Sequence, residues 1–168
     1  MPFRLDEIDR EIVALLLEDG RMSSAEITRR VGRLSERSVR YRIDRLVRSG
    51  VILVSAVVQP QALGYTVVGD VILEVAPGQL YEVAEKLVTF ENVSYVAGSV
   101  GDGDLSIQIY ARSNEELLRF VDEVIGKVPG VTRTRTVMVP WKLKDVYQWR
   151  LPASLEKKEG MRQGGGMV

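Results

Sequence analysis

The sequence predicts an α+β protein in which three helices precede a second domain with the order βαββαβ. Apolar residues recur at helical spacing up to residue 50, strand and helix patterns alternate from residue 66, and charge is unevenly distributed. Residues 1–50 hold eleven arginines and nine carboxylates, residues 51–130 four basic and eleven acidic residues, and residues 131–168 eight basic and three acidic residues. The chain of 168 residues is neutral as a whole, so two chemically different modules share one chain.

A capping residue predicts the start of each of the first three helices. Asp6 precedes the first helix, Ser23 the second and Ser35 the third, while Gly20 and Gly32 provide stops after the first two. Apolar residues at helical spacing give each helix a face that packs against the others. Two helices joined by a short turn that contains glycine follow the helix-turn-helix plan.

The third helix has one apolar and one cationic face. At 100° per residue, Val39, Ile43 and Leu46 fall on one stripe, and arginines fall on the opposite side and along both edges. Such a helix packs its apolar face internally and presents guanidinium groups that suit the bases and phosphates of a DNA groove. The predicted DNA-contacting residues belong to the cap, the outer face and the edges: Ser35, Arg37, Ser38, Arg40, Tyr41, Arg42 and Arg45.

The alternative interpretation is a solvated cationic helix that has no nucleic-acid partner. Residues 29–48 contain eight arginines and no lysine, and their only acidic residues are Glu36 and Asp44. A surface that serves solubility alone would mix signs and use lysine. Arginine instead offers a planar fork that matches guanine edges and phosphates. The composition therefore favours double-stranded DNA as the partner.

The second half alternates strand and helix patterns. One helix follows the break at Pro77-Gly78 and another follows the capping residue Ser113. The order βαββαβ predicts a ferredoxin-like fold, in which a four-stranded antiparallel sheet carries both helices on one face. The expected strands are residues 66–76, 93–100, 105–111 and 131–139.

The predicted sheet has a second face that no helix covers. In the first strand this face carries Val68, Asp70, Ile72 and Glu74, a mixture of apolar and charged residues. A mixed face favours contact with another protein surface, so we expect a homodimer in which two sheets meet. Two recognition helices in one dimer would meet DNA half-sites about one helical turn, or a multiple of it, apart.

The motifs LDEIDREIVALLLEDGR and SERSVRYRIDRLVRSGVI, taken in this order, strongly resemble the Lrp/AsnC family, also called feast/famine regulatory proteins. The resemblance covers about residues 5–145 and implies a transcriptional regulator. It implies a winged-helix-like helix-turn-helix domain at 1–50 that binds promoter DNA, and a linker at 51–65 with a strand at Ile52–Val58 and a hinge at Gln59-Pro60. A ferredoxin-like (RAM/ACT-like) domain at 66–145 would then dimerise, build tetramers or octamers and sense amino acids. We expect residues 146–168 to form a partly flexible C-terminal tail.

The stretch GDGD at residues 101–104 is a second candidate site. Asp102-Gly103 between two apolar strands indicates a type I′ hairpin turn, which is a purely structural explanation. A glycine-rich turn also exposes backbone N–H groups to a carboxylate, and an aspartate can receive an ammonium group, which together suit a free amino acid. By resemblance, Gly101, Asp102 and Asp104 match the family's Gly-x-aromatic-Asp motif, which lines the effector pocket between dimers. Gly103 replaces the aromatic residue.

Two further segments are candidates for the same effector site by this resemblance. The stretch TRTRTV places Thr132, Thr134 and Thr136 on one side of a strand and the intervening arginines on the other. The threonines can hydrogen-bond a polar ligand side chain, and ordinary strand formers are the alternative. Asp122 lies beside the apolar stripe of the last helix, where it either faces a dimer interface or is a solvated carboxylate.

The composition argues against several other functions. Cysteine and histidine are absent, which removes thiol nucleophiles, disulfides, the usual zinc ligands and the usual general base. We expect no cofactor and no metal, because no further carboxylates follow Asp102 and Asp104 at calcium-loop spacing. The longest nearly apolar run, residues 51–58, is far shorter than a membrane span. We therefore expect a cytoplasmic protein that does not associate with membranes.

Two functions remain open. The first is a sequence-specific transcriptional regulator modulated by a small amino acid that binds one assembly of dimers better than another. The second is an architectural DNA-binding protein without an effector, which would discriminate little between sequences and depend steeply on salt. The resemblance also extends to a branch that decarboxylates sirohaem, but that branch relies on histidines, which this chain lacks. We therefore expect no enzymatic activity.

Overall fold

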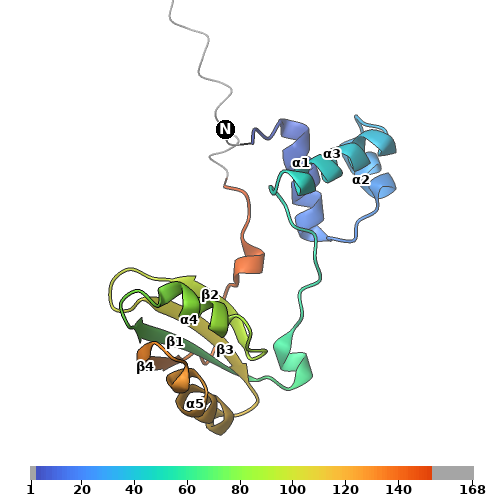
Figure 1. Ribbon diagram of the computed structural model, residues 1–168. Coiled ribbons are helices and arrows are strands. Elements are labelled where there is room, and N and C mark those ends of the chain that lie inside the picture. Colours follow the sequence, from blue (N-terminus) through green and yellow to red (C-terminus); the bar gives the residue numbers. More distant parts are fainter. Residues whose placement is uncertain (1–2, 153–168) are drawn as a thin grey trace, which may run out of the picture. The chain divides into compact units, whose positions relative to one another are not determined.

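The structure, a computed structural model, describes residues 3–152, which form two compact units (Figure 1). The described residues up to Val57 and from Asp145 onward form the first, which we call the helical unit. The residues Val58–Lys144 form the second, which we call the sheet unit. We propose, from the sequence, that residues 51–65 act as the linker between the two domains.

The helical unit contains the three predicted helices, α1 (Glu7–Glu18), α2 (Ser24–Val31) and α3 (Glu36–Arg48). The side chain of each predicted capping residue accepts a hydrogen bond from the backbone N–H three residues further on. These bonds satisfy donors that the first turn of a helix leaves free. The three helices enclose a core of buried aliphatic side chains: Ile12, Val13, Ile27, Val31, Val39 and Leu46.

The predicted linker strand at Ile52–Val58 is not formed within a single chain. Within the described chain these residues join no sheet, and Leu53 is 88% and Val58 66% exposed. A strand needs a neighbour that completes its backbone hydrogen bonds, and the described residues of one chain offer this segment none, so the linker strand stays a prediction. At the predicted hinge, Pro60–Leu63 form a short 3-10 helix, η1.

The predicted tail begins with a segment that is attached to the helical unit. Val146–Gln148 form a 3-10 turn, η3, and the half-buried Leu151 packs against the core of the three helices. A hollow of about 390 Å³ lies between this segment and α1, lined by Leu17 and Leu151 among others. Residues 153–168 of the predicted tail lie outside the described part of the chain.

The sheet unit has the predicted βαββαβ order (Figure 1). Its four strands form an antiparallel sheet in the order β2-β3-β1-β4. The elements are β1 (Val67–Val75), α4 (Leu80–Leu87), β2 (Val93–Gly98), β3 (Leu105–Ala111), α5 (Asn114–Glu123), the 3-10 turn η2 (Ile125–Lys127) and β4 (Val131–Met138).

Both helices pack on the same face of this sheet. Alternate residues of β1 and β3, such as Val71 and Ile107, share a core with Val83 of α4 and Leu117 of α5. A Cβ atom on Gly69 would lie 2.7 Å from Leu117 Cδ2, so α5 approaches β1 this closely because residue 69 is glycine. The even-numbered residues of β1 lie on the opposite face, which no described helix covers. We call it the open face.

We predict that Leu151→Ala lowers the free energy of unfolding of the helical unit by about 1–2 kcal/mol, because it removes a half-buried side chain from the core. Urea denaturation followed by circular dichroism measures the change. Leu143→Ala is the matched control, because Leu143 is 86% exposed. Equal stability of the two variants would show that Leu151 does not pack on the helical core in solution.

Candidate nucleic-acid interface and ligand site

The apolar stripe of α3 packs as the sequence predicts. Val39 and Leu46 are completely buried, and the partly buried Ile43 packs against the same core. At the start of the helix the Ser35 hydroxyl accepts from the backbone N–H of Ser38, and the two hydroxyl groups lie 3.0 Å apart. The packing therefore turns a defined outer face of α3 toward solvent.

The outer face of α3 consists of Arg37, Arg40 and Tyr41, with Ser38 half-buried beside them. The Tyr41 side chain is 62% exposed. The Arg37 side chain makes no hydrogen bond or ion pair with any other described residue. Arg40 donates to Glu36 at 2.9 Å, but both side chains are about half exposed or more, and such a pair contributes at most about 1 kcal/mol. These side chains are available to a ligand.

Arg42 and Arg45, which the sequence also predicts to contact DNA, form ion pairs with carboxylates of α1 and its cap. Arg42 Nη1 donates to Asp6 Oδ2 and to Asp9 Oδ1, each at 2.7 Å, and Arg45 Nη2 donates to Asp9 Oδ2. Asp9 is completely buried. Arg42 borders the apolar stripe, and both arginines reach carboxylates at the start of α1. A buried carboxylate left without its cations would cost several kcal/mol, so these contacts are structural.

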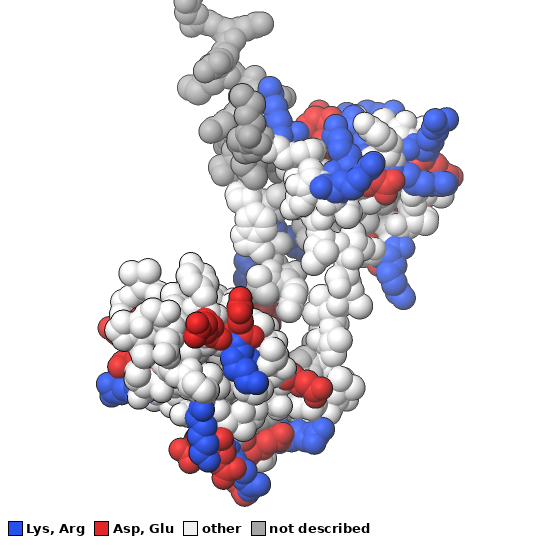
Figure 2. All heavy atoms as spheres, in the orientation of Figure 1, with Lys and Arg blue, Asp and Glu red and all other residues white. Residues whose placement is uncertain are grey.

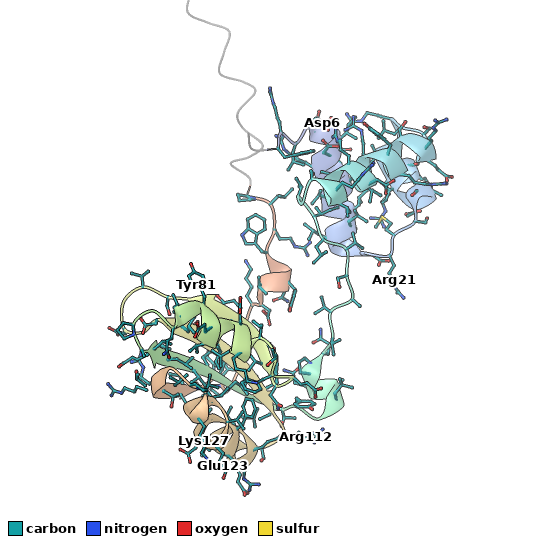
Figure 3. The ribbon with its side chains drawn as sticks, viewed as in Figure 1. Asp6, Arg21, Tyr81, Arg112, Glu123 and Lys127 are labelled. Carbon is teal, nitrogen blue, oxygen red and sulfur yellow. The ribbon has the colours of Figure 1, made fainter. Side chains whose placement is uncertain are left out.

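The pKa of Asp6 reflects the same contacts. Partial burial raises it, but the hydrogen bond from the Arg42 guanidinium, the backbone N–H of Asp9 and the charge of Arg42 outweigh burial and hold the pKa of Asp6 below its ordinary value. Asp6 stands at the start of α1, where it also caps the helix (Figure 3). The Arg42 contact therefore favours the charged form of Asp6.

The arginines of α2 and of the turn after it are also engaged with carboxylates. Arg29 and Arg30 pair with Glu26, Arg30 pairs with Glu18, and Arg33 pairs with Glu11. Lys and Arg side chains gather over the helical unit, with carboxylates interspersed among them (Figure 2). Of the eight arginines between residues 29 and 48, only Arg37 and Arg48 have no carboxylate partner within the described chain.

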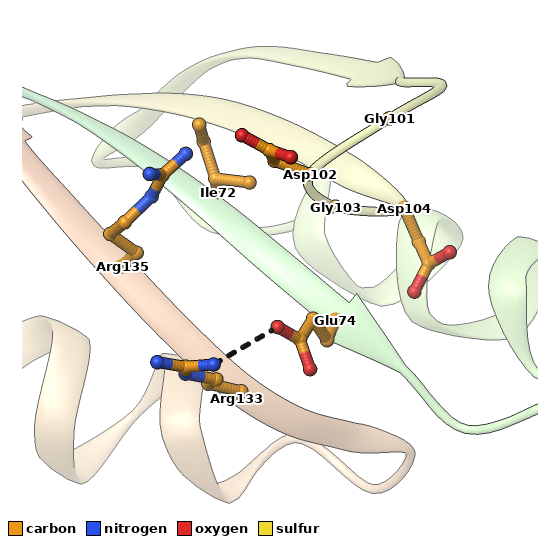
Figure 4. A pocket seen from close by; sticks show the side chains of 8 residues that line it. All are labelled: Ile72, Glu74, Gly101, Asp102, Gly103, Asp104, Arg133 and Arg135. Atoms are coloured by element: carbon orange, nitrogen blue, oxygen red, sulfur yellow. Dashed lines mark hydrogen bonds and ion pairs between the residues drawn. The ribbon is translucent and has the colours of Figure 1, made fainter.

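The open face of the sheet unit carries a hollow of about 400 Å³ beside the 101–104 loop. We call it the loop hollow (Figure 4). Glu74 of β1 and Arg133 of β4 form an ion pair at 3.5 Å along one wall. The loop hollow is lined by Ile72, Glu74, Gly101, Asp102, Gly103, Asp104, Arg133 and Arg135.

The loop itself is not a type I′ turn centred on Asp102-Gly103. That turn needs positive φ at both central residues, and of the two loop glycines only Gly101 has a positive φ, 125°. The backbone N–H of Asp104 instead donates to the carbonyl oxygen of Leu73 at 2.8 Å. The Asp104 carboxylate accepts from the backbone N–H of Val75 at 2.7 Å. Asp104 therefore fastens the loop to the end of β1, and Asp102 is the loop carboxylate left to meet a ligand.

The predicted threonines do not line the loop hollow. Thr134 pairs with Leu73 and Thr136 with Val71 in the β1–β4 ladder, and paired residues of an antiparallel ladder point to the same face. Leu73 and Val71 lie in the core under the helices, so these threonines point toward the helix side. The hydroxyl of Thr132 donates to the carbonyl oxygen of Glu74 at 3.0 Å.

Asp122 is also not part of the loop hollow. It is an exposed residue of α5, on the helix side of the sheet. Within one chain the structure therefore supports its interpretation as a solvated carboxylate.

Sequence reasoning missed Ile72, Glu74, Arg133 and Arg135 as lining residues. The alternation along TRTRTV correctly separated threonines from arginines, but it could not decide which set faces the loop. The pairing of Ile72 with Arg135 and of Glu74 with Arg133 decides it. The sequence did contain a signal for this register. Glu74 of β1 and Arg133 of β4 carry opposite charges, and opposite charges favour direct pairing on one face of a sheet.

No described helix is both long and apolar enough to cross a membrane. No group of three or more acidic residues in the described chain could hold a metal ion.

The helical unit and the sheet unit together define a class of protein: a helix-turn-helix protein that carries a second, α+β domain with a ligand-sized hollow. Residues 5–52 match the family model described as winged helix-turn-helix DNA-binding, and residues 71–148 match the Lrp/AsnC ligand binding domain. The chain is 41% identical over 140 residues to the HTH-type transcriptional regulator FL11 of Pyrococcus abyssi, covering 83% of this chain and 91% of that one. It is 36% identical over 141 residues to the regulator LrpA of Pyrococcus horikoshii, covering 83% and 99%. The chain therefore belongs to the Lrp/AsnC family of transcriptional regulators.

Solved structures show the same fold. AsnC of E. coli superposes with a TM-score of 0.79 at 21% identity, over 85% of this chain and 97% of that one. A transcriptional regulator from Neisseria meningitidis, solved as a complex with L-Met, superposes with a TM-score of 0.80 at 21% identity, over 89% and 97%. The predicted fold class is thereby confirmed.

We predict that Arg42→Ala lowers the free energy of unfolding of the helical unit by about 1–3 kcal/mol, because it leaves buried Asp9 with one cation instead of two. Arg40→Ala, which removes the same charge from an exposed pair, should change stability by less than about 1 kcal/mol. Urea denaturation at neutral pH compares the two. Similar losses would contradict the structural role of Arg42.

The pH dependence of the free energy of unfolding tests the contact between Arg42 and Asp6. The folded-state pKa of Asp6 is lowered, so its contribution to stability is present above the ordinary aspartate pKa of about 4 and is lost as pH falls through the lower, folded value. Between about pH 5 and pH 2, stability should therefore fall less steeply in Arg42→Ala than in Arg40→Ala.

Proposed function

We propose that this regulator reads DNA sequence through the outer face of α3 and that a free amino acid bound in the loop hollow modulates it. The observation that carries the first part is the free guanidinium of Arg37 beside the exposed Tyr41 ring. A helix of 13 residues is about 20 Å long and fits the major groove of B-DNA, which is about 12 Å wide. Arg37 and Tyr41 contact base edges.

The remaining predicted contacts divide into two kinds. Arg40 exchanges its weak pair with Glu36 for a phosphate, since surface pairs are easily replaced. Ser35 and Ser38, whose hydroxyls lie at the N-terminus of α3, contact the DNA backbone there. Arg42 and Arg45 hold α3 in place through their ion pairs with Asp6 and Asp9.

The open face of the sheet unit supports a dimer. Away from the loop hollow it carries Tyr95 and Val137 among polar residues, and these two are 55% and 49% exposed. A second copy packed on this face would bury them. Two-fold symmetry then presents two α3 helices to a roughly palindromic site, and such dimers assemble further into tetramers or octamers.

The loop hollow supports an amino-acid effector. Asp102 and Arg135 provide opposite charges on its walls, as a zwitterion requires. The Neisseria meningitidis regulator of the same fold was solved with L-Met. The effector acts by binding one assembly of this protein more tightly than another.

The role is regulatory rather than catalytic, and its place is the cytoplasm. The relatives that align with 83% of this chain are named transcriptional regulators. A protein that binds chromosomal promoters works where the chromosome is.

We predict that Arg37→Ala and Tyr41→Ala each reduce the preference for the cognate operator over random DNA by about 1–3 kcal/mol, the value of one good base contact. Arg40→Ala should weaken binding to both DNAs about equally. Fluorescence anisotropy with an operator selected from a random library, and with scrambled DNA at the same salt concentration, measures both affinities. If Arg37→Ala weakens both equally, α3 does not read bases through Arg37.

We further predict that at least one of the twenty amino acids raises the melting temperature of the protein, and that Asp102→Asn abolishes the rise. Binding to the folded state alone stabilises it by about 2.7 kcal/mol at a ligand concentration one hundred times Kd. Asp122→Asn is the matched control, because Asp122 is an exposed carboxylate outside the loop hollow. No shift with any amino acid would favour an architectural DNA-binding protein without an effector.

A further inference from the structure

Ile72 occupies the space that a side chain at residue 103 would need. A Cβ atom on Gly103 would lie 2.3 Å from Ile72 Cγ2 and 3.2 Å from the carbonyl oxygen of Leu73. Gly103 does not have a positive φ, so its backbone conformation does not require glycine. The contact with Ile72 does require it, and Ile72 rather than the loop provides the apolar wall of the loop hollow.

Most charges around the loop hollow already have partners. Glu74 is paired with Arg133, and the Asp104 carboxylate accepts a hydrogen bond from the backbone N–H of Val75. The side chains of Asp102 and Arg135 make no hydrogen bond or ion pair with any other described residue. They are one anion and one cation on the same hollow.

The two unpaired charges, Asp102 and Arg135, lie close to Ile72. Ile72 and Arg135 are directly opposite each other in the β1–β4 ladder, so their side chains are neighbours on the open face. The Ile72 side chain lies between the Arg135 guanidinium and the Asp102 carboxylate (Figure 4). A ligand that spans the two charges must therefore lie over Ile72.

We propose that Ile72 determines which effectors the loop hollow accepts, and that it selects α-amino acids with apolar side chains. The ligand's ammonium group lies at Asp102 and its carboxylate at Arg135, which leaves its side chain against Ile72. A charged or strongly polar side chain would lose water against this isoleucine without gaining a partner. This inference rests on the proposed function, because it takes an amino acid as the effector.

Isothermal titration of the full-length protein tests the selection, with L-alanine, L-leucine, L-phenylalanine, L-aspartate and L-lysine as probes. The wild type should bind leucine at least about tenfold more tightly than aspartate or lysine. Ile72→Ala shortens the apolar wall and enlarges the space beside it, so it should shift the phenylalanine-to-leucine affinity ratio toward phenylalanine by about tenfold, a change of about 1.4 kcal/mol. Ile72→Val, which keeps the branched shape, should shift the ratio in the same direction by a smaller factor. Val88→Ala is the control, because Val88 follows α4 and is 63% exposed.

The outcomes separate this inference from the function on which it rests. If the wild type binds none of the five probes, the selection of apolar side chains by Ile72 is refuted, and the amino-acid effector is refuted as well only if none of the twenty amino acids raises the melting temperature. If the wild type binds amino acids but the two Ile72 variants keep its affinity ratios, the effector stands and the selection by Ile72 is refuted. A wild type that prefers aspartate or lysine refutes the apolar selection as well.

The claim that Ile72 fills the space beside Gly103 can be tested without a ligand. Gly103→Ala should lower the melting temperature in the wild-type background and much less in an Ile72→Ala background, because the shorter side chain leaves room for the new methyl group. Gly98→Ala is the control, since a Cβ at Gly98 meets no atom within 4 Å. Equal losses from Gly103→Ala in both backgrounds would show that Ile72 does not occupy this space.

Discussion

The buried carboxylate of Asp9 is the constraint on which the DNA-contacting surface depends. A charge with no exposure must be matched by cations, and here both cations come from α3. They fix the rotation of α3 about its own axis as well as its distance from α1. Because residues of an α-helix are set 100° apart, Arg37 lies about 140° around the axis from Arg42, so the contact that holds Arg42 inward turns Arg37 outward. Phe3 also helps to hold Arg45 in place, since its ring centroid lies 5.4 Å from the Arg45 guanidinium carbon.

This arrangement explains how a neutral chain can bind DNA. Most arginines of α2 and α3 are balanced by carboxylates of their own unit, so they add little to a long-range attraction for phosphates. Within the described chain, Arg37 and Arg48 are the arginines of α2 and α3 without a carboxylate partner, and both lie on the same side of α3. Binding that relies on a few placed groups derives more from base contacts and less from counterion release than binding by a uniformly basic surface. The count of arginines in the sequence therefore overstates the charge offered to DNA.

The fold could be predicted from the sequence because caps, breaks and periodicity are local signals. Asp6, Ser23 and Ser35 begin helices where the pattern places them, and the alternation along β1 correctly separates the core face from the open face. The failures all depend on a partner that is distant in sequence. The inward position of Arg42 depends on Asp9 of another helix, and the position of the threonines in β4 depends on their register with β1. Residue type alone could not supply these relations.

The open face connects ligand binding to assembly in the proposed function. The loop hollow opens on the same surface that a second sheet would cover, so a bound ligand and a packed partner alter each other's surroundings. Linkage requires the effect to be reciprocal: if assembly strengthens ligand binding by some factor, the ligand strengthens assembly by the same factor. A ligand that spans Asp102 and Arg135 neutralises two otherwise unpartnered charges on this face. Removing isolated charges lowers the cost of covering the face with another protein surface, so within this scheme ligand binding and sheet-to-sheet packing strengthen each other.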